Sequence, residues 1–380
     1  MRHNKHNITF KFSHEPVEFN KWTDKATLQY CLGAILYMPG TKSIIGKILE
    51  NEISELKSMV MCFEDAISEQ ELSSAEENVL FHLDALASAL DNKKLNIDDL
   101  PLIFIRVRNI EQFYAFSEKL TKRLAQVLTG FVFPKFYSVN AHAYLDKLQE
   151  LNKNFETILY GMPILEGKNI AYSETRAGEL ENLKLILDKY QKYILNIRIG
   201  GTDFSSLFGV RRGINTSVYD ILPVRDAISD ILNFFSRIED NYTVSAPVWE
   251  YFLAYADDDI KQYIGDNIHH SILSKEKIVN EAIDGLLREI LQDKTNGMVG
   301  KTVIHPSHLR FVNAMQAITL EEFEDATQIL QAKGGVIKSL EGNKMNEVGP
   351  HKSWAEKVIL RAKVYGVIES ENDYLELFKG

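Results

Sequence analysis

The segment Ile194-Leu195-Asn196-Ile197-Arg198-Ile199-Gly200-Gly201-Thr202-Asp203-Phe204 is an apolar, β-branched run that opens into two glycines and then one acid. This sequence is typical of a buried parallel strand that ends at an active-site rim, with its carboxylate directed into a cleft. A second segment, 158–166, ends in the same way at Glu166. Two acids at the C-terminal ends of adjacent strands form a ready site for one hard divalent cation.

Short apolar runs alternate with longer amphipathic stretches along most of the chain, which predicts parallel strands joined by helices. Eight such strands favour a closed (β/α)8 barrel, a TIM barrel, over a doubly wound sheet. No Gly-x-Gly-x-x-Gly follows the first strand, which counts against a dinucleotide-binding fold. The expected strands are 34–38, 59–63, 102–107, 130–133, 157–165, 194–199, 242–246 and 298–304, and the expected helices include 110–128, 174–190, 218–238 and 272–291.

The pattern changes after the eighth strand. A helix is expected over 320–330, with Thr319 as its N-cap and Glu322 in the capping-box position. A Gly-rich polar stretch and a final helix over 353–365 follow. We therefore expect an N-terminal segment over 1–24, a barrel over 25–312 and a helical C-terminal arm over 313–380. The arm is too short for its own core and is expected to pack on the barrel or on a neighbouring subunit.

Composition excludes several classes of protein. With 45% hydrophobic and 25% charged residues, the chain of 380 residues has the composition of a globular protein. A net charge of −10 argues against nucleic acid as the main partner, and no apolar stretch is long enough to cross a membrane. The N-terminus lacks the apolar core of a secretory signal. Cys31 and Cys62 are expected as reduced core thiols, so a cytoplasmic location follows by elimination.

Several charged residues lie at the ends of the expected strands. Glu64 and Asp65 follow the second strand, and Lys135 follows the fourth. The third strand carries Arg106 and Arg108, which are two residues apart and therefore expected on one face. Because barrel enzymes place their chemistry at the C-terminal ends of the strands, we expect these side chains near the two acids described above.

Six motifs in one order carry a resemblance to a known superfamily. They are Phe63-Glu64-Asp65-Ala66, Ile105-Arg106-Val107, Phe133-Pro134-Lys135, Glu166, Gly200-Gly201-Thr202-Asp203 and Gly300-Lys301-x-x-Ile304-His305-Pro306. In this order they resemble the HpcH/HpaI aldolase and citrate lyase β-subunit superfamily of carbon–carbon bond lyases, over roughly residues 32–330.

The resemblance implies a TIM barrel in which Glu166 and Asp203 hold Mg²⁺ or another divalent cation such as Mn²⁺. It implies aldol- or Claisen-type cleavage or condensation of an oxo or hydroxy acid through a metal-bound enolate, with Arg106 at a substrate carboxylate or the enolate oxygen. A cation and a fixed guanidinium together neutralise such an oxygen. Glu64 and Asp65 are then candidate catalytic residues, as base, water ligand or support for the metal site. The residues assigned to substrate binding are Arg108, Lys135, Gly201, Thr202 and Arg211.

The chain departs from its relatives at two of these places. Relatives usually have Asn where this chain has Arg108, and a second inward guanidinium suits a more anionic substrate, a dicarboxylate or a phosphorylated compound. Relatives that resemble malyl-CoA lyase carry an aspartate in the tail that reaches a neighbour's site. Glu347 is nearest to that position here, so a homo-oligomer is expected and a tail contribution is possible.

Simpler readings exist for the same residues. Asp203 alone is also a good helix N-cap, Arg106 also suits an ion pair with Glu64 or Asp65, and Lys135 also suits a bridge to a barrel acid. Two alternative functions stay open. One is an acyl-CoA-dependent lyase or thioesterase, and the other is a catalytically inactive barrel that serves as a binding or assembly subunit.

Overall fold

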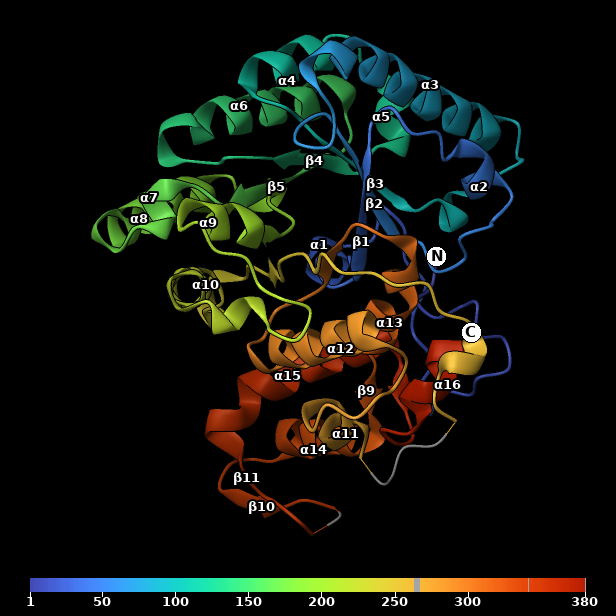
Figure 1. The fold of residues 1–380 in the computed structure, drawn as a ribbon, viewed down its shortest axis with the longest axis vertical. Helices are drawn as coiled ribbons and strands as arrows, with labels where there is room; N and C mark the ends of the chain where they lie inside the picture. Colours follow the sequence, from blue (N-terminus) through green and yellow to red (C-terminus); the bar gives the residue numbers. More distant parts are fainter. Residues whose placement is uncertain (263–266, 341, 380) are drawn as a thin grey trace.

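Eight parallel strands form a closed barrel (Figure 1). The computed structural model describes residues 1–262, 267–340 and 342–379. The strand order is β7-β6-β5-β4-β3-β2-β1-β8, and a parallel bridge between Ala246 and Lys301 closes the barrel between β7 and β8. The predicted TIM barrel is therefore confirmed. The strands are β1 (Ala34–Pro39), β2 (Ser58–Cys62), β3 (Leu102–Arg106), β4 (Gly130–Phe133), β5 (Tyr160–Leu165), β6 (Ile197–Ile199), β7 (Val244–Ser245) and β8 (Lys301–Val303).

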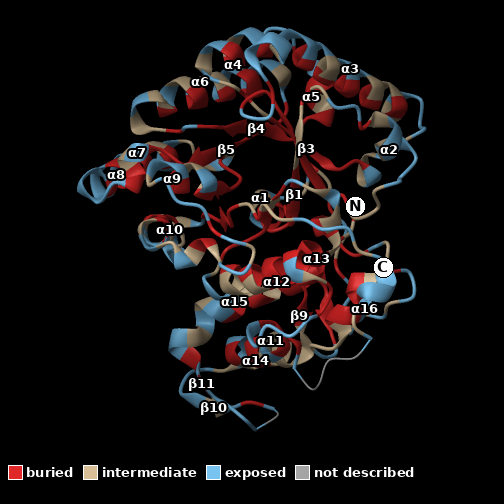
Figure 2. Cartoon of the chain, in the orientation of Figure 1, coloured by how far each residue is buried: buried red, intermediate tan, exposed pale blue. Residues whose placement is uncertain are grey.

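The strands consist mostly of buried residues (Figure 2). Successive residues of a strand point alternately into the barrel and toward the helices. Val60 and Phe104 belong to one buried cluster inside the barrel, whereas Met59 and Ile103 belong to the larger cluster under the helices. The helices around the strands are α3 (Leu72–Asp91), α4 (Ile110–Ser117), α5 (Lys122–Val127), α6 (Ser138–Phe155), α7 (Lys168–Ala171), α8 (Ser173–Lys189), α9 (Gly201–Leu207), α10 (Leu222–Phe235), α11 (Ile268–Leu273), α12 (Glu281–Thr295) and α13 (Leu309–Ala314).

Two of the expected helices differ from the structure because polar caps interrupt them. The stretch 110–128 divides into α4 and α5, and the Thr121 side chain accepts a hydrogen bond from the backbone N–H of Leu124 to start α5. The helix predicted over 272–291 begins later in the structure. The Asn280 side chain accepts from the backbone N–H groups of Ala282 and Ile283, and α12 therefore begins at Glu281.

The N-terminal segment closes the end of the barrel opposite the predicted site. Met1 and Phe19 are buried in the same cluster as the interior strand residues. The backbone N–H of Val17 donates to the carbonyl of Lys363 (2.8 Å), and the hydroxyl of Tyr365 donates to the carbonyl of Tyr30 (2.6 Å). The first and last parts of the described chain therefore meet beneath the barrel.

The C-terminal region packs on the barrel, but it also has a small core, which differs from the expectation. Helices α14 (Leu320–Gln331) and α15 (Val348–Tyr365) and strands β9 (Ile318–Thr319) and β12 (Val367–Ile368) enclose a separate apolar cluster that includes Ala326 and Val358. Thr319 caps α14 as predicted, accepting from the N–H of Glu322. A hairpin of β10 (Val336–Lys338) and β11 (Met345–Glu347) lies within the expected polar stretch, and α16 (Asp373–Lys379) packs on α13.

The expected boundary after residue 312 falls inside α13, whose residues belong to the barrel's main apolar cluster. None of the helices in the described ranges combines the length and apolar character needed to cross a membrane.

Candidate active site

A cavity of about 380 Å³ opens at the C-terminal ends of the strands. Its lining comes from seven of the eight strands or from the residues that follow them, namely β1, β2, β3, β5, β6, β7 and β8. The parallel barrel brings these ends to one rim because every strand runs in the same direction. Both predicted metal acids, Glu166 and Asp203, lie in this lining.

Glu166 and Asp203 share one side of the cavity. Glu166 follows β5 directly and is buried, and its Oε1 accepts a hydrogen bond from the backbone N–H of Lys135 at 2.7 Å. Asp203 is the third residue of α9, whose N-cap is Gly200, so the alternative role of Asp203 as the N-cap is wrong. Burial and then the neighbouring charge of Asp203 raise the pKa of Glu166 to about 8. Burial also raises the pKa of Asp203.

This pair fits a divalent cation. Burial disfavours the charged form of both carboxyl groups, and a positive charge between them would offset that cost. Mg²⁺ commonly takes only one or two protein carboxylates and keeps other positions for water and substrate. Among the residues that the structure describes, no group of three or more His, Cys, Asp or Glu is placed to hold a metal. The two acids are therefore the candidate ligands.

Arg106, at the end of β3, faces the same cavity with its side chain 12% exposed. Its Nη2 lies 3.1 Å from Oε2 of Glu64 and 3.5 Å from Oδ2 of Asp65, and its Nε donates to Sγ of Cys62 at 3.0 Å. Lys135 forms an ion pair with Glu64. The simpler ion-pair roles of Arg106 and Lys135 are thus present. These ion pairs also hold the two cations, Arg106 and Lys135, and the two acids, Glu64 and Asp65, beside the candidate metal ligands.

Glu64 keeps one oxygen without an aligned hydrogen bond. The contact between its Oε2 and Arg106 is close enough for an ion pair, but that buried oxygen has no partner with hydrogen-bond geometry among the described residues. Burial raises the pKa of Glu64, although the charge of Arg106 opposes this. Glu64 is therefore a better proton acceptor near neutral pH than an exposed glutamate.

Five of the predicted site residues are not part of the cavity lining: Glu64 and Lys135, which pair with each other beside it, and Arg108, Arg211 and Glu347. Arg108 lies two residues beyond the end of β3, so the two-residue alternation of a strand no longer applies, and its Nη1 donates to the backbone carbonyl of Phe63 at 3.1 Å. Arg211 is exposed in a neighbouring cavity, and Glu347 is exposed at the end of β11. The expected second guanidinium is therefore not supplied by Arg108.

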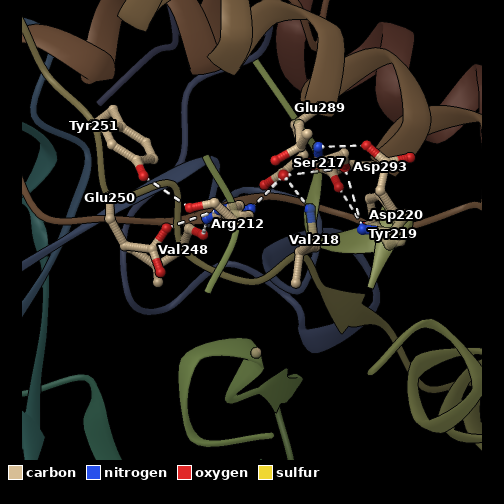
Figure 3. A network of polar contacts seen from close by, with 12 residues as sticks. Arg212, Ser217, Val218, Tyr219, Asp220, Val248, Glu250, Tyr251, Glu289 and Asp293 are labelled. Carbon is tan, nitrogen blue, oxygen red and sulfur yellow. Dashed lines mark hydrogen bonds and ion pairs between the residues drawn. The ribbon is translucent and has the colours of Figure 1, made fainter. Parts of the chain in front are cut away.

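Gly201 and Thr202 do line the cavity, and a buried ion-pair network supports them (Figure 3). The Thr202 hydroxyl donates to Glu250 at 3.1 Å, and Arg212 pairs with both Glu250 and the fully buried Glu289. Lys301 of β8 continues the network through Glu289 (2.9 Å) and Asp293 (2.8 Å). The network ties the loop after α9 to β8 and α12.

Sequence reasoning missed Arg198 and Tyr37. Arg198 is the middle residue of β6 and points into the barrel, where it lines the cavity with Tyr37 of β1. The guanidinium carbons of Arg198 and Arg106 lie 5.4 and 5.6 Å from the centre of the Tyr37 ring. The signal was present in the sequence, since Arg198 interrupts the apolar run that ends at Ile199.

These observations define an α/β barrel with a cavity at the C-terminal ends of its strands. Two acids and an arginine line this cavity together. The family model described as "C-C_Bond_Lyase of the TIM-Barrel fold" matches residues 26–367. The chain belongs to this family of carbon–carbon bond lyases. The family model thereby confirms the carbon–carbon bond lyase barrel that the six sequence motifs implied.

Several solved structures are similar to the chain, and the first of those below supports the same fold. CitE from Mycobacterium tuberculosis, in complex with magnesium, acetoacetate and coenzyme A, superposes with a TM-score of 0.51 and 16% sequence identity, covering 88% of this chain and 99% of that one. The M. tuberculosis citrate lyase β subunit with oxaloacetate and magnesium has a TM-score of 0.44 and 15% identity, covering 74% of this chain and 96% of that one. Haloferax volcanii malate synthase has a TM-score of 0.47 and 10% identity, covering 73% of this chain and 72% of that one. No curated protein sequence matches the chain.

Proposed function

We propose that this protein is a divalent-cation-dependent lyase that cleaves or forms a carbon–carbon bond in a small oxo or hydroxy acid. The observation that carries the proposal is the pair of buried Glu166 and half-buried Asp203, which share one cavity with Arg106. A scaffold has no need of two carboxyl groups whose pKa values are both raised by burial in one cavity with a guanidinium.

Residues that line the cavity and residues beside it have separate roles in such a reaction. Mg²⁺ or Mn²⁺ held by Glu166 and Asp203 would stabilise negative charge on a substrate oxygen. Arg106 presents forked donors that suit a carboxylate. Glu64 accepts the proton of the substrate hydroxyl, the carbon–carbon bond breaks, and its electron pair moves into the neighbouring carbonyl group of the leaving fragment. Lys135 holds Glu64 in place.

The test is turnover of a panel of oxo and hydroxy acids and their CoA thioesters, with pyruvate, oxaloacetate or acetyl release as the signal. We expect activity with Mg²⁺, none with a chelator, and recovery when Mg²⁺ is returned. The thioesters in the panel separate this function from that of an acyl-CoA-dependent enzyme.

The matched variants are Asp203→Asn, which removes a proposed ligand charge, and Asp226→Asn, which makes the same change on the exposed face of α10. The first is expected to lose Mg²⁺ binding and turnover, and the second to keep both. Full activity of Asp203→Asn, or turnover in the presence of chelator, would rule the proposal out.

A further inference from the structure

Arg198 is a buried cation with no acid beside it. The residue is 1% exposed, and no carboxylate of the described residues lies within ion-pair distance. Its Nη1 donates weakly to the hydroxyl of Ser245 at 3.4 Å and its Nη2 donates to the hydroxyl of Thr302, while its buried Nε has no partner. Buried arginines are normally paired, because removing a charge from water is costly.

A comparison with Arg212 shows that the lack of an acidic partner sets Arg198 apart. Arg212 is also buried, but two carboxylates, those of Glu250 and Glu289, meet its charge (Figure 3). The barrel therefore builds a compensated site for one arginine and leaves the other without one. Arg198 differs in a second way, since it lines the cavity at the strand ends.

Arg106 adds to the positive field around Arg198. Burial lowers the pKa of Arg198, and the charge of Arg106 acts in the same direction. The charge of Arg106 is already met by Glu64 and Asp65. Arg198 is thus the cation of the cavity that no described carboxylate pairs with, so its charge is available to an anionic ligand.

We propose that Arg198 binds an anionic group of the substrate that is distinct from the group taken by Arg106, and so selects substrates with two negative charges. This inference rests on the proposed function for the position of the substrate. The second group is a carboxylate or a phosphate, because both match the forked donors of a guanidinium. The Tyr37 ring lies against both guanidinium groups.

The experiment measures anion binding to the whole protein by calorimetry and thermal unfolding in the presence of chelator, so it does not depend on turnover or on the metal. The probes are succinate, acetate and inorganic phosphate. The variants are Arg198→Met, Arg198→Lys, and the exposed control Arg237→Met in the segment after α10. We expect succinate or phosphate to bind the wild-type protein more tightly than acetate does.

Arg198→Met is expected to weaken that dianion affinity at least about tenfold, with acetate affinity unchanged, because a charge-assisted bidentate contact is lost. Arg198→Lys should recover part of the loss, and Arg237→Met should match the wild type. Loss for succinate alone identifies a carboxylate, and loss for phosphate alone identifies a phosphoryl group. The free Arg198→Met protein should unfold at or above the wild-type temperature, because no ion pair is broken.

Equal dianion affinity in the wild-type and Arg198→Met proteins would overturn the proposal. A lower unfolding temperature of both Arg198 variants, without selective loss of dianion binding, would also overturn it, because Arg198 would then be structural. If instead no acid is turned over but dianion binding still depends on Arg198, the lyase proposal fails and the anion site stands.

Discussion

Gly200 allows the carboxylate of Glu166 to sit where a metal ligand is needed. Its backbone is not left-handed, with φ at −91°, so an alanine fits the chain conformation. A Cβ at this position would, however, lie less than 3.0 Å from Cβ and Oε2 of Glu166 and 3.2 Å from its Cδ. Cβ of Glu166 cannot retreat, because Leu165 pairs with Ile199 and the N–H of Lys135 binds Oε1.

Gly200→Ala must therefore move the Glu166 carboxylate by several tenths of an ångström or spread β5 from β6. Overpacking of this kind costs about 1–3 kcal/mol of folding free energy. Catalytic groups tolerate displacements of only about 0.5 Å, and a misplacement of about 1 Å can lower turnover by about 100-fold. We expect lower stability in urea, weaker Mg²⁺ binding by calorimetry, and a loss of kcat/KM approaching that factor.

The matched control is Gly178→Ala in α8, where an added Cβ meets nothing within 4 Å. There the same substitution should raise stability by roughly 1 kcal/mol, because alanine is the better helix former. Its Mg²⁺ affinity and turnover should not change. If Gly200→Ala binds Mg²⁺ and unfolds like the wild type, the contact with Glu166 does not position the carboxylate and the reasoning fails.

Three further perturbations test other parts of the molecule. Lys301 is 1% exposed and pairs with Glu289 and Asp293. Lys301→Met should lower the free energy of unfolding in urea by about 3–5 kcal/mol. An unchanged midpoint of urea unfolding would contradict the stabilising role of this network. Burial lowers the pKa of His3 to about 3, so stability is retained above pH 6.5 and declines as the pH falls toward 3. His3→Gln should reduce the loss between pH 7 and pH 5 by about 2 kcal/mol in urea unfolding, whereas parallel pH profiles would exclude this effect. Arg108→Met should lower stability by roughly 1–3 kcal/mol and leave the substrate KM unchanged, and a raised KM at unchanged stability would instead assign the guanidinium to substrate.

Much of the fold could be predicted from the sequence because the residue pattern of each strand depends on its own burial. Strands buried on both faces require apolar, often β-branched residues, so all eight strands appear as short apolar runs. Parallel strands bring their C-terminal ends to one rim, so the sequence alone predicts that the acids after β5 and β6 lie in one cavity. The helix boundaries at Thr121 and Asn280 were less accessible, since a polar cap inside an amphipathic stretch competes with the helical pattern.

The sequence by itself determined the barrel, its eight strands and the meeting of Glu166 with Asp203, because chain direction and burial on both strand faces leave few alternatives. Only the tertiary structure decided which second arginine joins Arg106 in the cavity. Arg108 lies past the end of β3 and reaches a backbone carbonyl, whereas Arg198 lies within β6 and faces inward. Where a long side chain ends depends on partners distant in the sequence, and those partners exist only once the barrel has closed.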